Sequence, residues 1–103
     1  MPRLPGLASL RVLQAVARGV EYGFDICTDT ALPSGTVYPA LTRFEREGHV
    51  RSSWEDAAKA HRDGRPARRY YRITADGRRA LAALLADLGV EAPRRARPVR
   101  ARS

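Results

Sequence analysis

The sequence has few of the residues on which disulfides, metal sites and membrane spans depend. It has one cysteine, Cys27, so no intramolecular disulfide can form, and its two histidines lie too far apart for a zinc-ligand pattern. No apolar run approaches the roughly 20 residues that cross a bilayer, and Arg11 interrupts the apolar N-terminus that a signal peptide needs. These absences predict a cytoplasmic protein that enters no membrane and uses neither a metal nor another cofactor.

Catalytic motifs are lacking as well. The chain contains no Gly-rich phosphate loop, and neither histidine has a nucleophile near it in a recognised catalytic pattern. A chain of 103 residues forms one small domain, which buries only about two thirds of its unfolded surface. We therefore expect a protein that is not an enzyme and that gains stability from a partner subunit.

Arginine is the residue in excess. Lysine and arginine number 19 against 11 acidic residues, for a net charge of +8, and arginine suits bidentate contacts with phosphate or guanine. Five arginines without an acid lie in residues 92–103, and six basic residues against Asp63 lie in residues 58–72. Both clusters can attract a polyanion, although a charged tail with two prolines is also typical of a disordered solubilising end.

The apolar pattern predicts three helices in the first half of the chain. Apolar residues on one helical face indicate helices over residues 8–18 and, more briefly, 23–30. Ser34 is a good N-cap for a third helix over residues 35–47, in which Pro39 should tighten or bend the first turns. The third helix has a thin apolar face, and its opposite face is small at the start and basic farther on.

The second half predicts a hairpin and one more helix. Apolar and polar residues alternate with period two over residues 49–55 and 69–73, which indicates two strands. The long connection over residues 56–68 gives the hairpin a charged tip. Thr74 caps a last helix over residues 75–88, and its apolar residues form a ridge that consists of Leu81, Leu84, Leu85 and Leu88.

This order of elements is that of a winged helix, a mainly helical α+β fold with three helices, a β-hairpin wing and a C-terminal dimerisation helix. In a helix-turn-helix the second helix of the close pair enters the major groove, and here that helix covers residues 34–47. The basic wing over residues 56–68 would lie against phosphates or in the adjacent minor groove, where arginine is favoured. Winged helices also serve as protein-binding modules.

Three segments add a family resemblance to this layout. They are Tyr22–Ile26, Leu32–Leu41 with its Ser-Gly-Thr-Val-Tyr-Pro run, and Gly64–Thr74 with its Gly-Arg-Pro run. Over about residues 9–88 the chain resembles the PadR-like family of winged-helix transcriptional regulators. The resemblance implies a dimer, a recognition helix that opens with the first run, and a wing that contains the second. With its single last helix the chain is similar to the short subgroup of the family, which dimerises through that helix and the first helix.

The chain is predicted to have three parts. Residues 1–7 are an irregular lead-in, residues 8–88 form the PadR-like winged-helix domain, and residues 89–103 form a basic, disordered tail. Because two copies related by a two-fold axis would cover each other's leucine ridge, Leu81, Leu84, Leu85 and Leu88 are the expected homodimer interface.

The expected DNA contacts come from the open face of the third helix and from the wing. Thr36 lies near the helix start, where base edges are read, and Arg65 at the predicted tip is the strongest wing candidate. The alternatives are structural: Ser34 is first a helix cap, Pro39 shapes the helix, and an arginine can simply be solvated. The full set of candidates is Ser34, Thr36, Tyr38, Pro39, Arg43, Arg65, Arg68 and Arg69.

Trp54 has two interpretations. A lone tryptophan in a small protein usually packs in the core, and we favour that position. The family resemblance offers the alternative that Trp54 stacks on a flat aromatic ligand, as aromatic residues do at some PadR-like dimer interfaces.

We therefore expect a dimeric, sequence-specific transcriptional regulator, a repressor, that binds a pseudo-palindromic operator in double-stranded DNA on the bacterial nucleoid. The alternative is a winged-helix module for protein interaction or for non-specific nucleic-acid binding. A specific repressor protects half-sites about one helical turn apart, whereas a non-specific binder loses affinity with salt equally for all sequences. The sequence identifies no small-molecule effector.

Overall fold

The computed structural model describes residues 6–89. Its elements follow the predicted order of three helices, a hairpin and a last helix, so the winged-helix fold is confirmed. Residues 90–103 of the predicted tail and residues 1–5 of the predicted lead-in lie outside the described residues, and Leu7, predicted as part of the lead-in, is the first residue of a helix. The elements are α1 (Leu7–Ala17), α2 (Gly23–Thr30), α3 (Ser34–Arg46), β1 (Val50–Trp54), α4 (Ala57–Arg62), β2 (Arg69–Ile73) and α5 (Ala75–Asp87).

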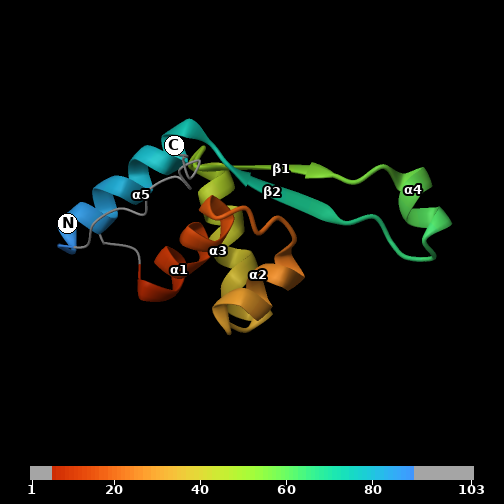
Figure 1. Ribbon diagram of the computed structural model, residues 1–103, viewed down its shortest axis with the longest axis horizontal. Coiled ribbons are helices and arrows are strands. Elements are labelled where there is room, and N and C mark those ends of the chain that lie inside the picture. The colour runs from red at the N-terminus through yellow and green to blue at the C-terminus, as the bar shows by residue number, and fades with distance from the viewer. Residues whose placement is uncertain (1–5, 90–103) are drawn as a thin grey trace, which may run out of the picture.

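The core lies where α1, α2, α3 and α5 meet (Figure 1). Each helix contributes the apolar residues that its periodicity places on one face, which is the condition for a helix to bury a stripe against its neighbours. Leu81 and Leu85 of α5 complete this core and pack over α1. The largest fully buried side chains are Leu13, Ile26, Leu41, Leu85, Val12 and Val37.

The hairpin projects from the helical body and carries α4 at its far end (Figure 1). Its antiparallel register runs from the pair Val50 and Ile73 to the pair Trp54 and Arg69. Tyr22 forms a β-bridge with Tyr70 on the other edge of β2. The base of the hairpin is thereby joined to the connection between α1 and α2.

The N-terminus of α3 differs from the prediction. Ser34 is the first helical residue and its side chain makes no capping hydrogen bond, so its prediction as the N-cap was wrong. The cap is Pro33, whose extended backbone directs its carbonyl to accept from the amides of Thr36 and Val37 at 2.9 and 3.1 Å. The helix then runs through Pro39, because only the bond to the exposed Gly35 carbonyl is lost.

The connection between the strands also differs from the prediction, because it contains α4. The Asp56 carboxylate accepts from the Ala58 amide at 2.9 Å and so caps this helix, of which Ala60 is the buried residue. A helix of six residues is not stable by itself. The sequence therefore predicted a loop here, because Gly64 and Pro66 are strong turn signals.

The prediction that Trp54 packs in the core was wrong. Its residue is 66% exposed. The strand β1 is buried at Val50, beside the helices, and exposed at Trp54, its opposite end. The alternating pattern correctly indicates a strand, but the helical body covers only the near end of that strand.

The start of α5 packs directly on the backbone that links α3 to β1. The Thr74 hydroxyl accepts from the Gly77 amide at 2.9 Å and donates to the Gly48 carbonyl at 2.7 Å, which confirms Thr74 as the helix cap. A Cβ atom added to Gly77 would lie 2.1 Å from the His49 carbonyl oxygen. Only glycine allows this approach.

We predict that Gly77→Ala lowers the free energy of unfolding by about 1–3 kcal/mol, because the added methyl group forces α5 away from the His49 carbonyl. Urea unfolding followed by circular dichroism measures the change. Gly35→Ala is the matched control, since a Cβ there meets nothing within 4 Å and alanine favours a helix interior. Equal stabilities of the two variants would contradict the close contact.

Candidate nucleic-acid interface

The side of α3 that faces away from the core is a narrow open arc. A helix turns by about 100° per residue, so positions three, four and seven apart share a side. Most of these side chains are small, which allows a close approach by another surface, and a basic residue follows at the end. The exposed residues of this arc are Ser34, Gly35, Tyr38, Pro39, Thr42 and Arg46.

The predicted contacts of α3 divide between the arc and its margin. Ser34, Tyr38 and Pro39 are exposed, whereas Thr36 and Arg43 are half-buried at the margin far from the wing. The Arg43 guanidinium lies 5.0 Å from the centre of the Phe44 ring, and its Nη2 has no hydrogen-bond partner among the described residues. Thr42 and Arg46 lie nearer the middle of the arc than Thr36 does.

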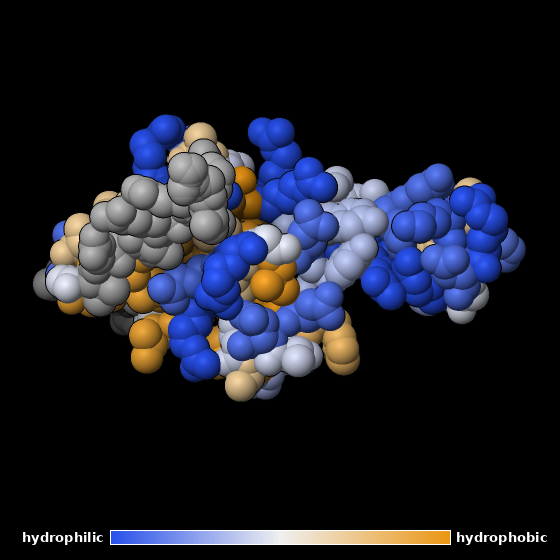
Figure 2. All heavy atoms as spheres, in the orientation of Figure 1, coloured by the Kyte–Doolittle hydropathy of each residue, from blue (hydrophilic) through white to orange (hydrophobic). Residues whose placement is uncertain are grey.

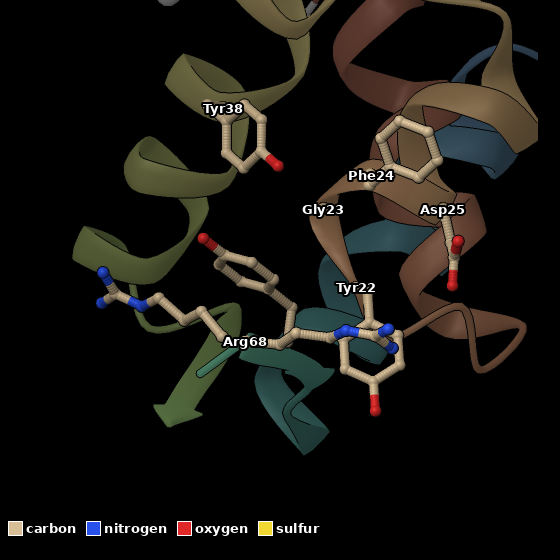
Figure 3. Close-up of a pocket in the computed structure, with 8 residues that line it drawn as sticks. Tyr22, Gly23, Phe24, Asp25, Tyr38 and Arg68 are labelled. Atoms are coloured by element: carbon tan, nitrogen blue, oxygen red, sulfur yellow. The ribbon is translucent and has the colours of Figure 1, made fainter. Parts of the chain in front are cut away.

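On the wing side of α3, Tyr38 leans against the start of α2. A Cβ atom on Gly23 would lie 2.4 Å from the Tyr38 hydroxyl oxygen, so the ring needs glycine there. Between α2, α3 and β2 there is a hollow of about 500 Å³ (Figure 3). Its walls are Tyr22, Gly23, Phe24, Asp25, Tyr38, Arg68, Arg69 and Tyr71.

The predicted contact Arg68 lies at this hollow. Its guanidinium is 4.7 Å from the centre of the Tyr22 ring, across which the side chain extends (Figure 3). The Tyr22 and Tyr70 ring centres are 4.9 Å apart. The hydrogen bond that Tyr70 shares with Tyr22, together with burial, raises the pKa of Tyr70. These contacts hold the base of the wing beside α2 and leave Arg68 exposed to solvent.

The predicted contact Arg69 joins the wing to α3. Its Nη2 donates to the Ser52 hydroxyl at 2.8 Å and lies 3.2 Å from the Glu45 carboxylate. The Ser52 hydroxyl also donates to Glu45. Glu45 lies on the margin of the open arc that faces the wing. This network therefore fixes the position of the hairpin relative to the open arc of α3.

Arg65, the predicted tip contact, is engaged within the wing. Its Nη2 donates to one oxygen of the Glu55 carboxylate at 2.7 Å, and its Nη1 donates to the other. The Arg68 amide also donates to Glu55, at 3.2 Å. The Glu55 side chain is 2% exposed. We call this pair the wing clasp, and it closes the two ends of the connection around α4.

The clasp shifts the acid–base equilibrium of its carboxylate. The hydrogen bonds from Arg65 outweigh the effect of burial and lower the pKa of Glu55 from its usual value near 4.5 to about 2, with help from the Arg68 amide. In turn, the hydrogen bonds to Glu55 raise the pKa of Arg65. Both groups are therefore charged at neutral pH.

Other basic residues of the wing have no carboxylate partner among the described residues. These are Lys59 and Arg62 on α4 and Arg68, the residue just before β2, and all three are exposed. Figure 2 shows hydrophilic residues covering the far end of the hairpin. The wing thus has side chains that hold its shape and others that are open to a polyanion.

The expected dimer ridge is only partly exposed. Leu81 and Leu85 are buried in their own chain, so they do not present the interface predicted for them. Leu84 is half-buried and Leu88 is 53% exposed. Leu7, on the neighbouring α1, is 71% exposed. The apolar surface that remains therefore lies on α1 and α5.

Glu55, Glu45 and Tyr22 are not found by the sequence analysis, although they position the wing. A signal existed for Glu55, which is an acid beside a segment of six basic residues. An acid beside such a segment favours an internal ion pair, although the adjacent Asp56 carries the same signal. No local signal identifies Glu45 or Tyr22, because their partners are distant in the sequence.

The segment of sequence that forms this helix face and hairpin matches a known family. The profile of the transcriptional regulator PadR-like family matches residues 12–83, well over half of the chain. The chain belongs to this family. This match confirms the resemblance that the sequence indicated. PadR-like proteins are transcriptional regulators, which agrees with a role other than catalysis.

Solved PadR structures are similar in fold. A PadR-like transcription factor from Bacteroides fragilis has a TM-score of 0.67 at 25% identity, covering 82% of each chain. A PadR family regulator from Clostridium difficile R20291 has a TM-score of 0.69 at 21% identity, covering 82% of this chain and 88% of that one. One from Eggerthella lenta has a TM-score of 0.63 at 28% identity, covering 79% and 70%. No curated protein matches the chain significantly.

Two other features are absent within residues 6–89. No group of three or more metal-binding side chains occurs there. None of the helices in this part of the chain is long and apolar enough to span a membrane.

We predict that the wing clasp makes stability depend on pH in the acid range. Because the pKa of Glu55 falls on folding, its contribution is complete above about pH 4.5 and is lost as the pH falls towards 2. Glu55→Gln should remove this part of the pH dependence, as measured by urea unfolding between pH 5 and 2. Arg65→Ala, which removes the partner, should flatten the same range. Unchanged pH profiles in both variants would contradict the clasp.

Proposed function

We propose that this PadR-like regulator is a dimeric repressor that binds a pseudo-palindromic operator, with α3 in the major groove and the wing along the flanking backbone. The observation that carries the proposal is the continuous surface formed by the open arc of α3 and the hairpin that Arg69 ties to it through Glu45. A reading helix and a wing held at a fixed angle can engage neighbouring grooves of one duplex.

The composition of the arc supports contact with DNA. Gly35, Pro39 and Thr42 are small, so the α3 backbone can come close to base edges. The first turn of α3 contains no acid, and an N-terminus without a carboxylate favours phosphate. Arg46 lies about three turns after Gly35 and is placed to contact the DNA backbone beside the same groove.

The wing supports a second kind of contact. Lys59 and Arg62 on α4 and Arg68, just before β2, are exposed. They would neutralise phosphates beside the helix site, a contribution that depends on salt and not on base sequence. Arg65 was predicted to contact DNA, but in this proposal it stabilises the shape of the wing, because its guanidinium is bound to Glu55.

A second candidate is a module that binds nucleic acid without sequence preference. The net charge of +8 favours it. Footprinting on the DNA upstream of the gene separates the two functions. A repressor should protect one pseudo-palindromic site with half-sites about one helical turn apart. Uniform, salt-sensitive protection would favour the second candidate.

We predict that α3 and α4 contribute different binding energies. Thr42→Val keeps the side-chain volume but loses one hydrogen bond, so operator affinity should fall about fivefold while random DNA is unaffected. Arg62→Gln should weaken both and lower the salt slope by about one unit, since one phosphate contact is lost. Fluorescence anisotropy on operator and random duplexes at several salt concentrations measures this. Equal effects of both changes on every duplex would contradict the assignment.

We predict that the dimer depends on the exposed end of the leucine ridge. Leu88→Lys should give a monomer that binds the operator weakly, and it should still fold because Leu88 is exposed. Sedimentation velocity measures the state. Phe24→Lys is the control, since Phe24 is 76% exposed and lies on α2, outside the leucine ridge. A wild-type monomer at micromolar concentration would contradict the proposal.

A further inference from the structure

Trp54 is an exposed aromatic residue that the helices do not use. It is the single tryptophan of the sequence and ends β1 with 66% of its surface exposed. Side chains alternate between the faces of a strand, so Trp54 lies on the face that also carries Val50 and Ser52. Ser52 contacts Glu45 of α3. Trp54 is thus on the side of the hairpin that looks towards α3.

The ring is held in place by Arg69. The two residues are opposite each other in the strand register, and the guanidinium lies 5.5 Å from the ring centre. Arg69 is itself fixed by Ser52 at 2.8 Å and by Glu45 at 3.2 Å. Trp54 is therefore presented on an arginine that is anchored to α3, at little further cost in side-chain entropy on binding.

Trp54 also extends the open arc of α3. At about 100° per residue, Tyr38 and Glu45 fall on the margin of the arc that faces the hairpin. From Glu45 the surface continues through Arg69 to the indole and then to the basic residues of α4. An apolar ring thus lies between the small side chains of α3 and the cations of the wing tip.

We propose that Trp54 is a DNA contact, with its indole packed against the deoxyribose rings and base edges of the minor groove that flanks the α3 site. This inference rests on the proposed function. The sugar faces of that groove are its apolar surface, and proteins place apolar side chains there beside cations that meet the phosphates. Burial of an exposed indole on binding is favourable because the ring leaves water.

The test uses the full chain and a labelled operator duplex, with anisotropy and tryptophan emission recorded in one titration. Because Trp54 is the single tryptophan, the emission reports this side chain alone. We expect emission to change and to saturate at the same DNA concentration as the anisotropy. Quenching of the bound protein by acrylamide should be several times weaker than in the free protein.

Variants give an independent measurement. Trp54→Ala should reduce operator affinity about tenfold, with unchanged circular dichroism and sedimentation, and Trp54→Phe should retain most of the affinity. Ser53→Ala is the matched control, since Ser53 is the exposed neighbour on the opposite face of β1 and should bind as the wild type does.

The outcomes separate this inference from the proposed function. Saturable anisotropy with unchanged emission, unchanged acrylamide quenching and wild-type affinity of Trp54→Ala would overturn the role of Trp54 and leave DNA binding intact. Failure of the wild-type chain to bind any selected duplex would overturn the proposed function itself. Quenching by a small aromatic compound, with no protection by DNA, would assign the ring to a ligand and overturn the DNA contact.

Discussion

The geometry of the candidate interface depends on the attachment of the hairpin to α3. A two-stranded hairpin has little stability of its own, and the helical body covers only the near end of this one. Polar contacts on both sides hold it. The Glu21 carbonyl accepts from the Tyr71 amide at 2.8 Å on one side, and Arg69 reaches Glu45 on the other. Without them the wing could rotate against the helix that it is proposed to assist.

Farther from the body, an ion pair takes the place of a core. Glu55 is almost completely buried against Arg65, and the same carboxylate accepts from the Arg68 amide. A buried carboxylate without such donors would be costly, so the acid and the turn of chain that bears Arg65 depend on each other. The basic residues of the wing thus divide by their neighbours: those near an acid fix the shape, and the remainder are available to a polyanion.

The sequence was sufficient for features that are local. Periodicity identifies α1, α2, α3 and α5 because each buries a stripe of its own, and Thr74 as a cap depends on a residue three positions away. The clasp joins residues ten positions apart, and the pair of Arg69 and Glu45 is wider still, so no local pattern specifies which residues pair. Trp54 shows the limit most plainly. Alternation assigns it to a face of the sheet, but only the length of the helical body decides whether that face is covered.

The leucine ridge has two structural roles, and the division bears on how a dimer would meet DNA. Leu81 and Leu85 fix α5 to α1 within one chain, and the α5 start is pressed on the backbone that follows α3. The exposed end of the ridge is therefore rigidly connected to the reading helix of its own protomer. In the proposed dimer a second copy seated on that end would set the distance between the two α3 helices, and this distance determines the half-site spacing. Small changes at the end of α5 would then alter the choice of operator without touching any residue that contacts DNA.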